Sequence, residues 1–561
     1  MVILGLCTGI HDSSAALVKD GEIICASSQE RFDRKKHSGA FPYDAIEFCL
    51  NEANIDVSEV DVVAIGMNWL KRGESRYAFR GANSKGNLKE YAENELLKDK
   101  IRELSVYKNL REDLNYGGKI VFVDHHMAHS ASCFYPSGFA ESAILVLDGA
   151  GEEAATSLLY ADDCSINKIS AINYPNSLGR YYGWITDYLG FRIESGEGKV
   201  MGLAPYGDLS LKDDLAKTLK ITESGYEVNF DYFDFNVDGR KGVSKKFIEE
   251  FGPKRLPGEK ITQHHMNIAR GVQSLFEDAV LKVVTNLKAV TKTENLCISG
   301  GGALNSVANG RIAESGLFKN IYIYPAAGDD GSSVGAALYT YYKDQKNHQY
   351  IQSNQSPYLG KGTDPEEIEK LLQNKKVKYS RPENIYSEVA KQLDQDKIIG
   401  IYWGRAEFGP RALGNRSILA NPSYEENRDR VNLKVKFRED FRPFAPSVLE
   451  EYATEYFHMN GFQSPYMIMT FQTKYPKRIR ATTHVNNSAR VQTVSKKLNA
   501  RYWKLIHEFY KISDLPIVLN TSFNKAKDVI VNTPEQALET FLTSGIDVLV
   551  LEEFLILKDE N

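Results

Sequence analysis

Residues 2–26 read VILGLCTGIHDSSAALVKDGEIICA, and this stretch predicts how the chain begins to fold. It contains three apolar runs, Val2–Cys7, Ala15–Val18 and Glu22–Ala26, and Asp20-Gly21 joins the second run to the third. Apolar β runs joined by Asp-Gly are a strong hairpin signal. We therefore expect the chain to open with three consecutive strands.

Strand and helix patterns alternate along the rest of the chain. Strand-like runs lie at Val62–Gly66, Ile120–Val123, Ala143–Leu147, Asn295–Ser299 and Asn320–Tyr324, with helical patterns at Pro42–Asn54, Gly86–Tyr107 and Gln263–Val290. Further on, we expect helices at Glu425–Lys434 and Asn499–Ile512, and strands near Ile398–Tyr402 and Pro516–Leu519. This alternation predicts an α/β protein built in layers.

The length of the chain, 561 residues, exceeds what one hydrophobic core supports, so we expect at least two domains. The stretch 343–365 is polar and weakly patterned, which is typical of a linker. The predicted organisation is a first domain at residues 1–350, a linker at 351–365 and a second domain at 366–561.

Composition and charge narrow the class of protein. Hydrophobic content of 42% and charged content of 25% are those of a globular protein, and the net charge of −5 does not support nucleic-acid or membrane-surface binding. The start MVILGLC lacks the basic and apolar parts of a signal peptide, and no long apolar run predicts a membrane span. The six cysteines form no Cys-x-x-Cys pair, so we expect reduced thiols in a cytoplasmic protein.

A histidine-rich segment, residues 124–129 (DHHMAH), follows the strand expected at 120–123. If a helix starts here, His125 and His129 share one face, as two ligands of one metal must. The glutamate of a His-Glu-x-x-His zinc protease is absent. Asp148 and Asp329 each follow a strand beside glycine, where a metal can approach. The set favours a divalent metal (iron, manganese or zinc) over purely structural histidines.

Residues 299–305 (SGGGALN) link an expected strand to a helical pattern. The backbone amides of this turn and the following helix N-terminus can receive a phosphate. The segment is not a Walker A loop, because Lys and Ser/Thr do not follow the last glycine. A tight strand-to-helix turn without a ligand explains the pattern equally well.

Residues 404–422 read GRAEFGPRALGNRSILANP and combine regularly spaced glycines with Arg405, Arg411 and Arg416. Glycine lets a backbone approach a ligand closely, and guanidinium groups bind phosphate and carboxylate oxygens in pairs. The segment therefore predicts an anion site, most plausibly for phosphate. An exposed basic loop is the alternative, but such loops rarely space glycine so regularly.

Further cations follow in the same half of the chain. Lys436 and Arg438 would point to the same side if the chain is extended there. Lys436 can join Arg411, Arg442 and Arg490 in surrounding a small doubly charged anion. Each alone is more often a surface charge, but their shared setting of glycine, proline and aromatic residues favours binding.

Together these motifs resemble the NodU/CmcH-type O-carbamoyltransferases, which include the Nod-factor, cephamycin and tobramycin carbamoyltransferases. The resemblance runs nearly end to end, and the segments 404–422 and 441–446 are its most specific parts. It is carried by His11–Ser14, Glu30–Phe32, the histidines at 125–129, Asp148-Gly149, Gly301–Asn305, Asp329–Gly331, Gly404–Pro422, Phe441–Pro446 and Asn520–Asn524.

The resemblance implies an N-terminal domain of the actin-like ATPase (ASKHA) superfamily, similar to the metal subunit that threonylcarbamoylates tRNA. It also implies a C-terminal α+β YrdC-like domain. Such enzymes convert carbamoyl phosphate and ATP, bound with Mg²⁺, to carbamoyl adenylate in the YrdC-like domain. The carbamoyl group then passes, at the N-terminal metal site, to a hydroxyl of a small-molecule acceptor such as a sugar or natural product.

The same resemblance implies roles for individual residues. Carbamoyl phosphate and the nucleotide are expected at Arg411, Lys436, Arg438, Arg442, Arg490, Asn520, Ser522, Gly301, Gly302 and Asn305. The metal ligands are expected to be His125, His129, Asp148 and Asp329, with iron(II) as the first choice and manganese or zinc as alternatives. His11 is expected to be the general base, oriented by Asp12, and Lys36 to neutralise the adenylate as AMP departs.

Three rival functions remain at this stage. A tRNA threonylcarbamoyladenosine enzyme uses related domains, but the acidic balance and the lack of a basic stripe count against tRNA. An actin-like kinase or ATPase has no use for the histidine pair or for the C-terminal half. A non-catalytic nucleotide sensor would not need so complete a set of polar residues. The identity of the acceptor and the formation of a homodimer are left open.

Overall fold

The computed structural model describes residues 1–9, 11–81, 87–234, 242–343 and 355–560. Contacts between Cα atoms divide the chain into two compact units. Unit 1 comprises Met1–Gln29 and Gly39–Gln355, and unit 2 comprises Glu30–Ser38 and Ser356–Asn561. The short segment 30–38 therefore folds with the C-terminal half of the chain, although it lies near the N-terminus in sequence.

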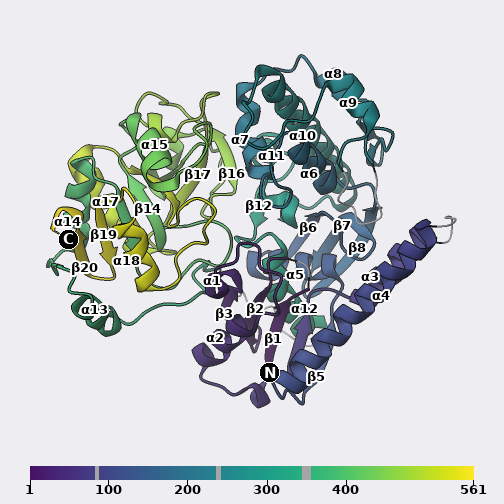
Figure 1. Ribbon diagram of the computed structural model, residues 1–561, viewed down its shortest axis with the longest axis horizontal. Helices are drawn as coiled ribbons and strands as arrows, with labels where there is room; N and C mark the ends of the chain where they lie inside the picture. The colour runs from purple at the N-terminus through teal and green to yellow at the C-terminus, as the bar shows by residue number, and fades with distance from the viewer. Residues whose placement is uncertain (10, 82–86, 235–241, 344–354, 561) are drawn as a thin grey trace. The chain divides into compact units, whose positions relative to one another are not determined.

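Unit 1 is built on two five-stranded sheets with the same plan (Figure 1). The first has the order β3-β2-β1-β4-β5, with strands Val2–Cys7, Ser14–Lys19, Glu22–Ser28, Val62–Ile65 and Lys119–Phe122 as β1 to β5. The second has the order β12-β11-β6-β7-β8, with strands Glu141–Leu147, Ala154–Asp162, Ser165–Asn173, Asn295–Ser299 and Asn320–Ile323 as β6, β7, β8, β11 and β12.

In each sheet the first three strands form an antiparallel meander, the fourth strand pairs in parallel with the first, and the fifth pairs in parallel with the fourth. Unit 1 therefore repeats one strand arrangement in its two sheets. The α/β prediction and the opening three strands are thus confirmed.

Two helices pack between the sheets of unit 1. Helix α12 (Ser332–Lys343) lies on β1 and β2, helix α5 (His125–Ser137) lies on β6 and β11, and the two helices pack on each other. Their crossing is close, because a Cβ atom on Gly335 would lie 1.7 Å from the carbonyl oxygen of Ala128. Close packing of α5 and α12 brings the N-terminal ends of the two helices close together.

Other helices of unit 1 surround this framework. They are α2 (Tyr43–Ala53), α3 (Trp69–Gly81), α4 (Asn87–Lys108), α6 (Leu178–Tyr188), α7 (Glu197–Leu203), α8 (Lys212–Leu215), α9 (Lys245–Phe251), α10 (Gln263–Thr291) and α11 (Ser306–Glu314). A small antiparallel pair, β9 (Leu219–Thr222) and β10 (Gly225–Val228), lies between α8 and α9 in sequence. The helices expected at 42–54, 86–107 and 263–290 are present as α2, α4 and α10, with Gly86 outside the described residues.

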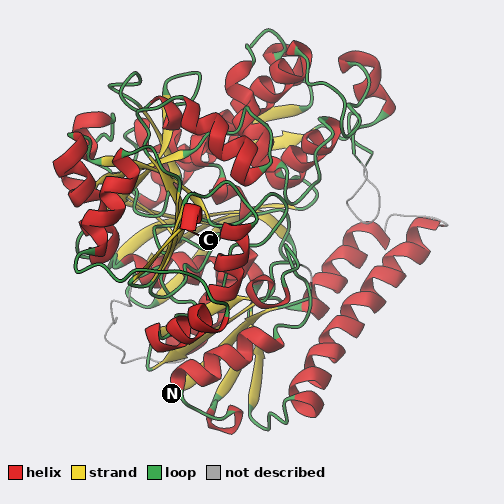
Figure 2. Ribbon diagram, turned by 60° about the vertical axis from the view of Figure 1, so that its left-hand side comes forward, coloured by secondary structure: helices red, strands yellow, loops and turns green. Residues whose placement is uncertain are grey.

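Unit 2 has a single mixed sheet of eight strands in the order β16-β17-β15-β18-β14-β13-β19-β20 (strands in yellow, Figure 2). These strands are β13 (Ile399–Tyr402), β14 (Arg416–Ala420), β15 (Ala445–Leu449), β16 (Met469–Gln472), β17 (Ser488–Val494), β18 (Ile517–Ser522), β19 (Val548–Leu551) and β20 (Phe554–Leu557). Its helices are α1 (Glu30–Asp33), α13 (Pro365–Asn374), α14 (Ile385–Asp394), α15 (Glu426–Arg430), α16 (Ala453–Tyr456), α17 (Ala500–Ser513) and α18 (Pro534–Leu542). The unit is α+β, as expected, and its core includes Tyr402, Leu519 and Leu549.

The helix expected over 425–434 is present, as α15 followed directly by a π-helix, Val431–Lys436. The extended chain expected at Lys436 and Arg438 is wrong. Phe437 then adopts a left-handed conformation with φ of 47°. Lys436 and Arg438 are therefore not in an extended chain, and the reason given for their shared direction does not hold.

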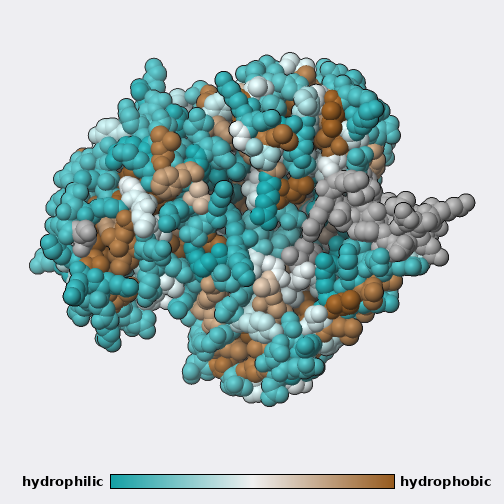
Figure 3. Space-filling model, viewed as in Figure 1, coloured by the Kyte–Doolittle hydropathy of each residue, from teal (hydrophilic) through white to brown (hydrophobic). Residues whose placement is uncertain are grey.

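Within the described residues, the structure contains no helix both long and apolar enough to cross a membrane. The face in Figure 3 is mostly hydrophilic, with hydrophobic residues in small groups.

Candidate functional site

The two central helices of unit 1 bring two histidines and two aspartates together. His125 and His129 lie one turn apart on α5, Asp148 follows β6, and Asp329 precedes α12. Asp329 Oδ1 is 3.5 Å from Nε2 of both histidines, and Asp148 Oδ2 is 3.5 Å from His125 Nε2. All four side chains are buried. The spacing predicted from sequence is thus realised as a compact buried cluster.

Hydrogen bonds outside the cluster orient both imidazole rings. His125 Nδ1 donates to the carbonyl oxygen of Gly66 at 2.8 Å, and His129 Nδ1 lies 3.3 Å from Ser299 Oγ. The two Nε2 atoms then face each other at 3.1 Å. Two nitrogen lone pairs at this distance need a proton or a cation between them. Orienting partners of this kind are typical of histidines that bind metal.

The charges of the cluster depend on each other. Burial acts to lower the pKa of His125, but Asp329 and Asp148 outweigh it and hold that pKa well above its usual value. Burial acts to raise the pKa of Asp329, but His11 and His125 keep it well below its usual value. Two carboxylates and two imidazoles in one buried place suit a divalent cation with mixed nitrogen and oxygen ligands. The cluster can therefore bind a metal.

His11 and Asp12 lie beside this cluster. His11 Nδ1 is 2.9 Å from Asp12 Oδ2, and His11 Nε2 is 3.7 Å from Asp329 Oδ2. Burial lowers the pKa of His11, yet Asp329 and Asp12 outweigh it and raise that pKa to about 10. An imidazole with so high a pKa is protonated at neutral pH, so His11 becomes a base only when the charge of Asp329 is offset.

The glycine-rich turn after β11 packs against the loop that carries Asp148. Gly300 has φ of 90°, and a Cβ there would lie 2.3 Å from the carbonyl oxygen of Leu147. The N–H of Gly301 points to Asp148 Oδ1 at 3.4 Å. Asn305 caps α11 through the N–H of Ala308, at 3.1 Å. The turn has a structural role, and it also brings Gly301 to the edge of the cluster, whereas Gly302 packs against Leu147.

Unit 2 contains a second cluster, made of cations. It consists of Arg411 between β13 and β14, Lys436, Arg438 and Arg442 between α15 and β15, and Arg490 on β17. Burial lowers the pKa of each of these side chains, and repulsion among them lowers several further. Among the described residues, the carboxylate that pairs with this group is Glu439, which lies 3.8 Å from Arg442. We call these five residues the basic cluster.

Two arginines of the basic cluster have little to neutralise them. Arg411 Nε is buried without a hydrogen-bond partner among the described residues. Arg490 Nη2 contacts Met467 Sδ at 3.9 Å, and the charges that act on it are those of Arg411, Arg438 and Arg442. Buried charges are normally paired, so this excess of positive charge indicates a site for a polyanion.

Residues of β18 and of the loop after it hold Lys436 in place. Its Nζ donates to the carbonyl oxygen of Ser522, to Asn524 Oδ1 at 2.7 Å and to Asn524 O at 3.1 Å. Ser522 Oγ lies 3.1 Å from the same nitrogen. Asn520 is deeper, where its Nδ2 donates to Gln492 Oε1 at 2.9 Å and its Oδ1 is buried without a partner among the described residues.

The three arginines of segment 404–422 have two different roles. Arg405 donates to the carbonyl oxygens of Leu359 and Gly360, at 2.7 and 3.1 Å. Arg416 is 0% exposed and donates to four carbonyl oxygens, those of Trp403, Asn415, Lys361 and Gly404. Only Arg411 of the three joins the basic cluster. Arg411 is also the one arginine of this segment for which the resemblance implied a role in binding.

The segment Glu30–Ser38 also belongs to unit 2. Arg31 Nη2 donates to the carbonyl oxygen of Gly409 at 2.9 Å, and Arg34 donates to the carbonyl of Ile530 at 2.7 Å and pairs with Asp528. Lys36 is exposed and lies close enough to Lys436 to lower its pKa. Within unit 2, Lys36 thus lies near Lys436 of the basic cluster, a placement that no pattern in the sequence indicates.

Comparison with known proteins identifies the family of this chain. The family model described as "Carbamoyltransferase N-terminus" matches residues 2–338, and the one described as "Carbamoyltransferase C-terminus" matches residues 390–558. The chain belongs to the carbamoyltransferase family. It is an enzyme that transfers carbamoyl groups, and the resemblance seen in the sequence is confirmed.

Relatives of this carbamoyltransferase match almost its whole length. An uncharacterized protein of Synechocystis is 38% identical over 99% of this chain and 96% of its own. Nodulation protein NolNO of Sinorhizobium fredii is 35% identical over 98% of this chain and 79% of its own. An uncharacterized protein of Methanocaldococcus jannaschii is 30% identical over 99% of this chain and all of its own.

Proposed function

We propose that this carbamoyltransferase makes carbamoyl adenylate in unit 2 and transfers the carbamoyl group to a small-molecule hydroxyl at the histidine–aspartate cluster of unit 1. The observation that carries the proposal is the basic cluster. Five buried or half-buried cations face one another there with a single ion pair, to Glu439, among the described residues. A phosphate-bearing substrate supplies the charge that this arrangement lacks.

The first half-reaction has two steps. Water displaces phosphate from carbamoyl phosphate and leaves carbamate. An oxygen of carbamate then attacks the α-phosphorus of ATP, pyrophosphate leaves, and carbamoyl adenylate forms. Arg411, Arg442 and Arg490 offset the charge of the departing phosphates, and Lys436 is fixed by Ser522 and Asn524 to do the same. Lys36 adds a further charge beside Lys436.

The second half-reaction would take place in unit 1. His125, His129, Asp148 and Asp329 would hold a divalent cation, with iron(II) as the first choice and manganese or zinc as alternatives. Such a cation supplies Lewis acidity toward the adenylate phosphate. His11, oriented by Asp12, takes the proton of the acceptor hydroxyl, and AMP departs as the oxygen–carbonyl bond forms. Gly301 presents its backbone N–H group at the edge of the cluster, and we expect the adjacent Gly302 to contribute to nucleotide binding.

The alternatives predict different products. An actin-like kinase or ATPase would cleave ATP to ADP and would leave the basic cluster without a substrate. A tRNA-modifying enzyme would need a basic surface, whereas this chain carries a net charge of −5. A sugar or natural-product hydroxyl therefore remains the proposed acceptor.

The test follows the nucleotide products. The protein is incubated with ATP, Mg²⁺, iron(II) and carbamoyl phosphate, and AMP, ADP and pyrophosphate are quantified by chromatography. We expect pyrophosphate only when carbamoyl phosphate is present, and AMP as water, in the absence of an acceptor hydroxyl, takes the carbamoyl group from the adenylate. Their formation without carbamoyl phosphate, or release of ADP, would contradict the proposal.

Variants separate the two half-reactions. Exchange of labelled pyrophosphate into ATP reports adenylate formation and needs no acceptor. Arg411→Ala should abolish this exchange, whereas His129→Ala should retain it and lose only carbamoyl transfer. Lys434→Ala, which removes an exposed lysine two residues before Lys436, is the matched control and should behave as wild type. Failure of both variants at the same step would refute the two-site scheme.

A further inference from the structure

Helix α5 carries both histidines of the cluster, and the side chain of its N-cap residue does not cap it. Asp124 is the N-cap residue of α5, yet its side chain makes no hydrogen bond to the first turn. Its carboxylate pairs instead with Lys71 Nζ at 2.7 Å. The first N–H groups of a helix have no partner within the helix and require one from elsewhere.

Glu152 supplies that partner from a distant part of the chain. Both of its carboxylate oxygens lie 3.0 Å from the backbone nitrogen of His125, which donates to them. A carboxylate is also favoured at this end of a helix by the helix dipole. Glu152 is 2% exposed, so these contacts form away from water, where they are stronger.

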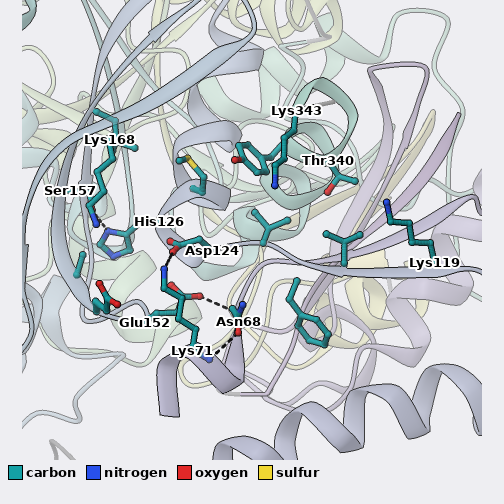
Figure 4. A pocket seen from close by; sticks show the side chains of 18 residues that line it. Asn68, Lys71, Lys119, Asp124, His126, Glu152, Ser157, Lys168, Thr340 and Lys343 are labelled. Atoms are coloured by element: carbon teal, nitrogen blue, oxygen red, sulfur yellow. Dashed lines mark hydrogen bonds and ion pairs between the residues drawn. The ribbon is translucent and has the colours of Figure 1, made fainter. Parts of the chain in front are cut away.

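The same carboxylate also holds the end of β4. Its Oε1 accepts a hydrogen bond from the backbone nitrogen of Asn68 at 2.8 Å. Two residues before Asn68, the carbonyl oxygen of Gly66 accepts from His125 Nδ1 at 2.8 Å. Glu152 therefore fixes both the backbone of His125 and the segment that orients its ring. Figure 4 shows Glu152 beside Asn68, in the wall of a cavity of about 540 Å³.

Glu152 lies on the loop that carries Asp148, four residues earlier in the chain. This loop lies tightly against α5, because a Cβ atom on Gly151 would be 2.7 Å from His126 Cδ2. Arg76 Nη2 donates to the carbonyl oxygen of Gly151 at 3.1 Å and holds the loop from the other side. The position of Asp148 relative to His125 is thus set through Glu152 and Gly151.

We propose that Glu152 is a positioning residue of the metal site. By binding the N–H groups of His125 and Asn68 it holds His125 Nε2 and Asp148 Oδ2, 3.5 Å apart, in the arrangement that one cation can share. This inference rests on the proposed function, in which the histidine–aspartate cluster binds a divalent cation. Partners behind the ligands typically change metal affinity by about 10- to 100-fold.

The test is titration of the full-length protein with Co²⁺, whose visible spectrum reports both affinity and ligand geometry. Glu152→Ala should weaken Co²⁺ binding by about 10- to 100-fold and alter the spectrum. Glu152→Gln keeps one oxygen that can accept from both amides, so it should restore most of the affinity. Glu152→Asp, one methylene shorter, should remain weak. Glu153→Gln, at the exposed neighbouring position, is the matched control and should bind as wild type.

His129→Ala separates the inference from the proposal beneath it. If His129→Ala binds Co²⁺ with wild-type affinity, the metal site itself is wrong. If His129→Ala loses Co²⁺ while Glu152→Asp keeps wild-type affinity and spectrum, only the role of Glu152 is overturned. The Asp variant keeps this outcome accessible if the Ala variant does not fold.

Discussion

Replacing Arg411 by methionine should make the ligand-free protein more stable while it destroys anion binding. Burial and the neighbouring Arg442 lower the pKa of Arg411 from 12.5 to about 10. That difference corresponds to about 3 kcal/mol of unfavourable free energy in the folded state. At pH 7 the guanidinium is charged in both the folded and the unfolded chain, so the whole penalty is present. It fades only as the pH rises above about 10.

Methionine has a similar length and no charge, so Arg411→Met should raise the free energy of unfolding by about 1–3 kcal/mol in anion-free buffer. In the presence of phosphate, the wild type should become the more stable of the two proteins. Phosphate at 100 times its dissociation constant stabilises the wild type by about 2.7 kcal/mol and should leave the variant unchanged. Thermal unfolding with and without phosphate measures both effects, and Lys434→Met is the control for loss of an exposed charge.

The reasoning would be refuted by either of two results. One is an Arg411→Met variant that is less stable than wild type without phosphate. The other is an equal stabilisation of variant and wild type by phosphate. Either would mean that the basic cluster is already neutralised within the chain and does not await an anion.

Three further predictions concern segments of unit 2. Lys36→Ala should slow pyrophosphate exchange at least several-fold, whereas Lys35→Ala, at the adjacent exposed position, should not. Arg416→Met should destabilise the protein by about 3 kcal/mol in chemical unfolding, because it leaves buried carbonyl oxygens without their donor. Gly414→Ala should cost more than about 2 kcal/mol in the same assay, because φ is 113° and the new Cβ would lie 2.3 Å from the Tyr502 ring; wild-type stability would refute the contact.

Local patterns in the sequence predicted the parts of the fold that depend on neighbouring residues. The opening strands and the long helix α10 carry clear apolar periodicity, and the two histidines at helical spacing did meet on α5. Strands β7 and β8 gave no such signal. β7 is buried along most of its length and so lacks alternation, whereas β8 is mostly exposed at the sheet edge.

Contacts between residues that are far apart in the chain could not be predicted from the sequence. Arg405, Arg411 and Arg416 look alike in the chain, yet only packing decides which of them binds carbonyl oxygens. Glu152 is separated by 27 positions from the helix it caps, and its own neighbourhood is a plain Gly-Glu-Glu loop. Residues 30–38 look like a solvated charge run until Arg31 and Arg34 are seen to bind backbone carbonyls of the C-terminal half.

The most direct test of the central claim, that the carbamoyl group passes through an adenylate, is an isotope experiment. Carbamoyl phosphate labelled with oxygen-18 on its carbonyl is supplied with ATP, and the AMP formed is analysed by mass spectrometry. Because a carbamate oxygen bridges to the α-phosphorus and leaves with AMP when the carbonyl carbon is attacked, we predict that AMP carries oxygen-18. AMP that forms only with carbamoyl phosphate but carries no label would contradict the adenylate.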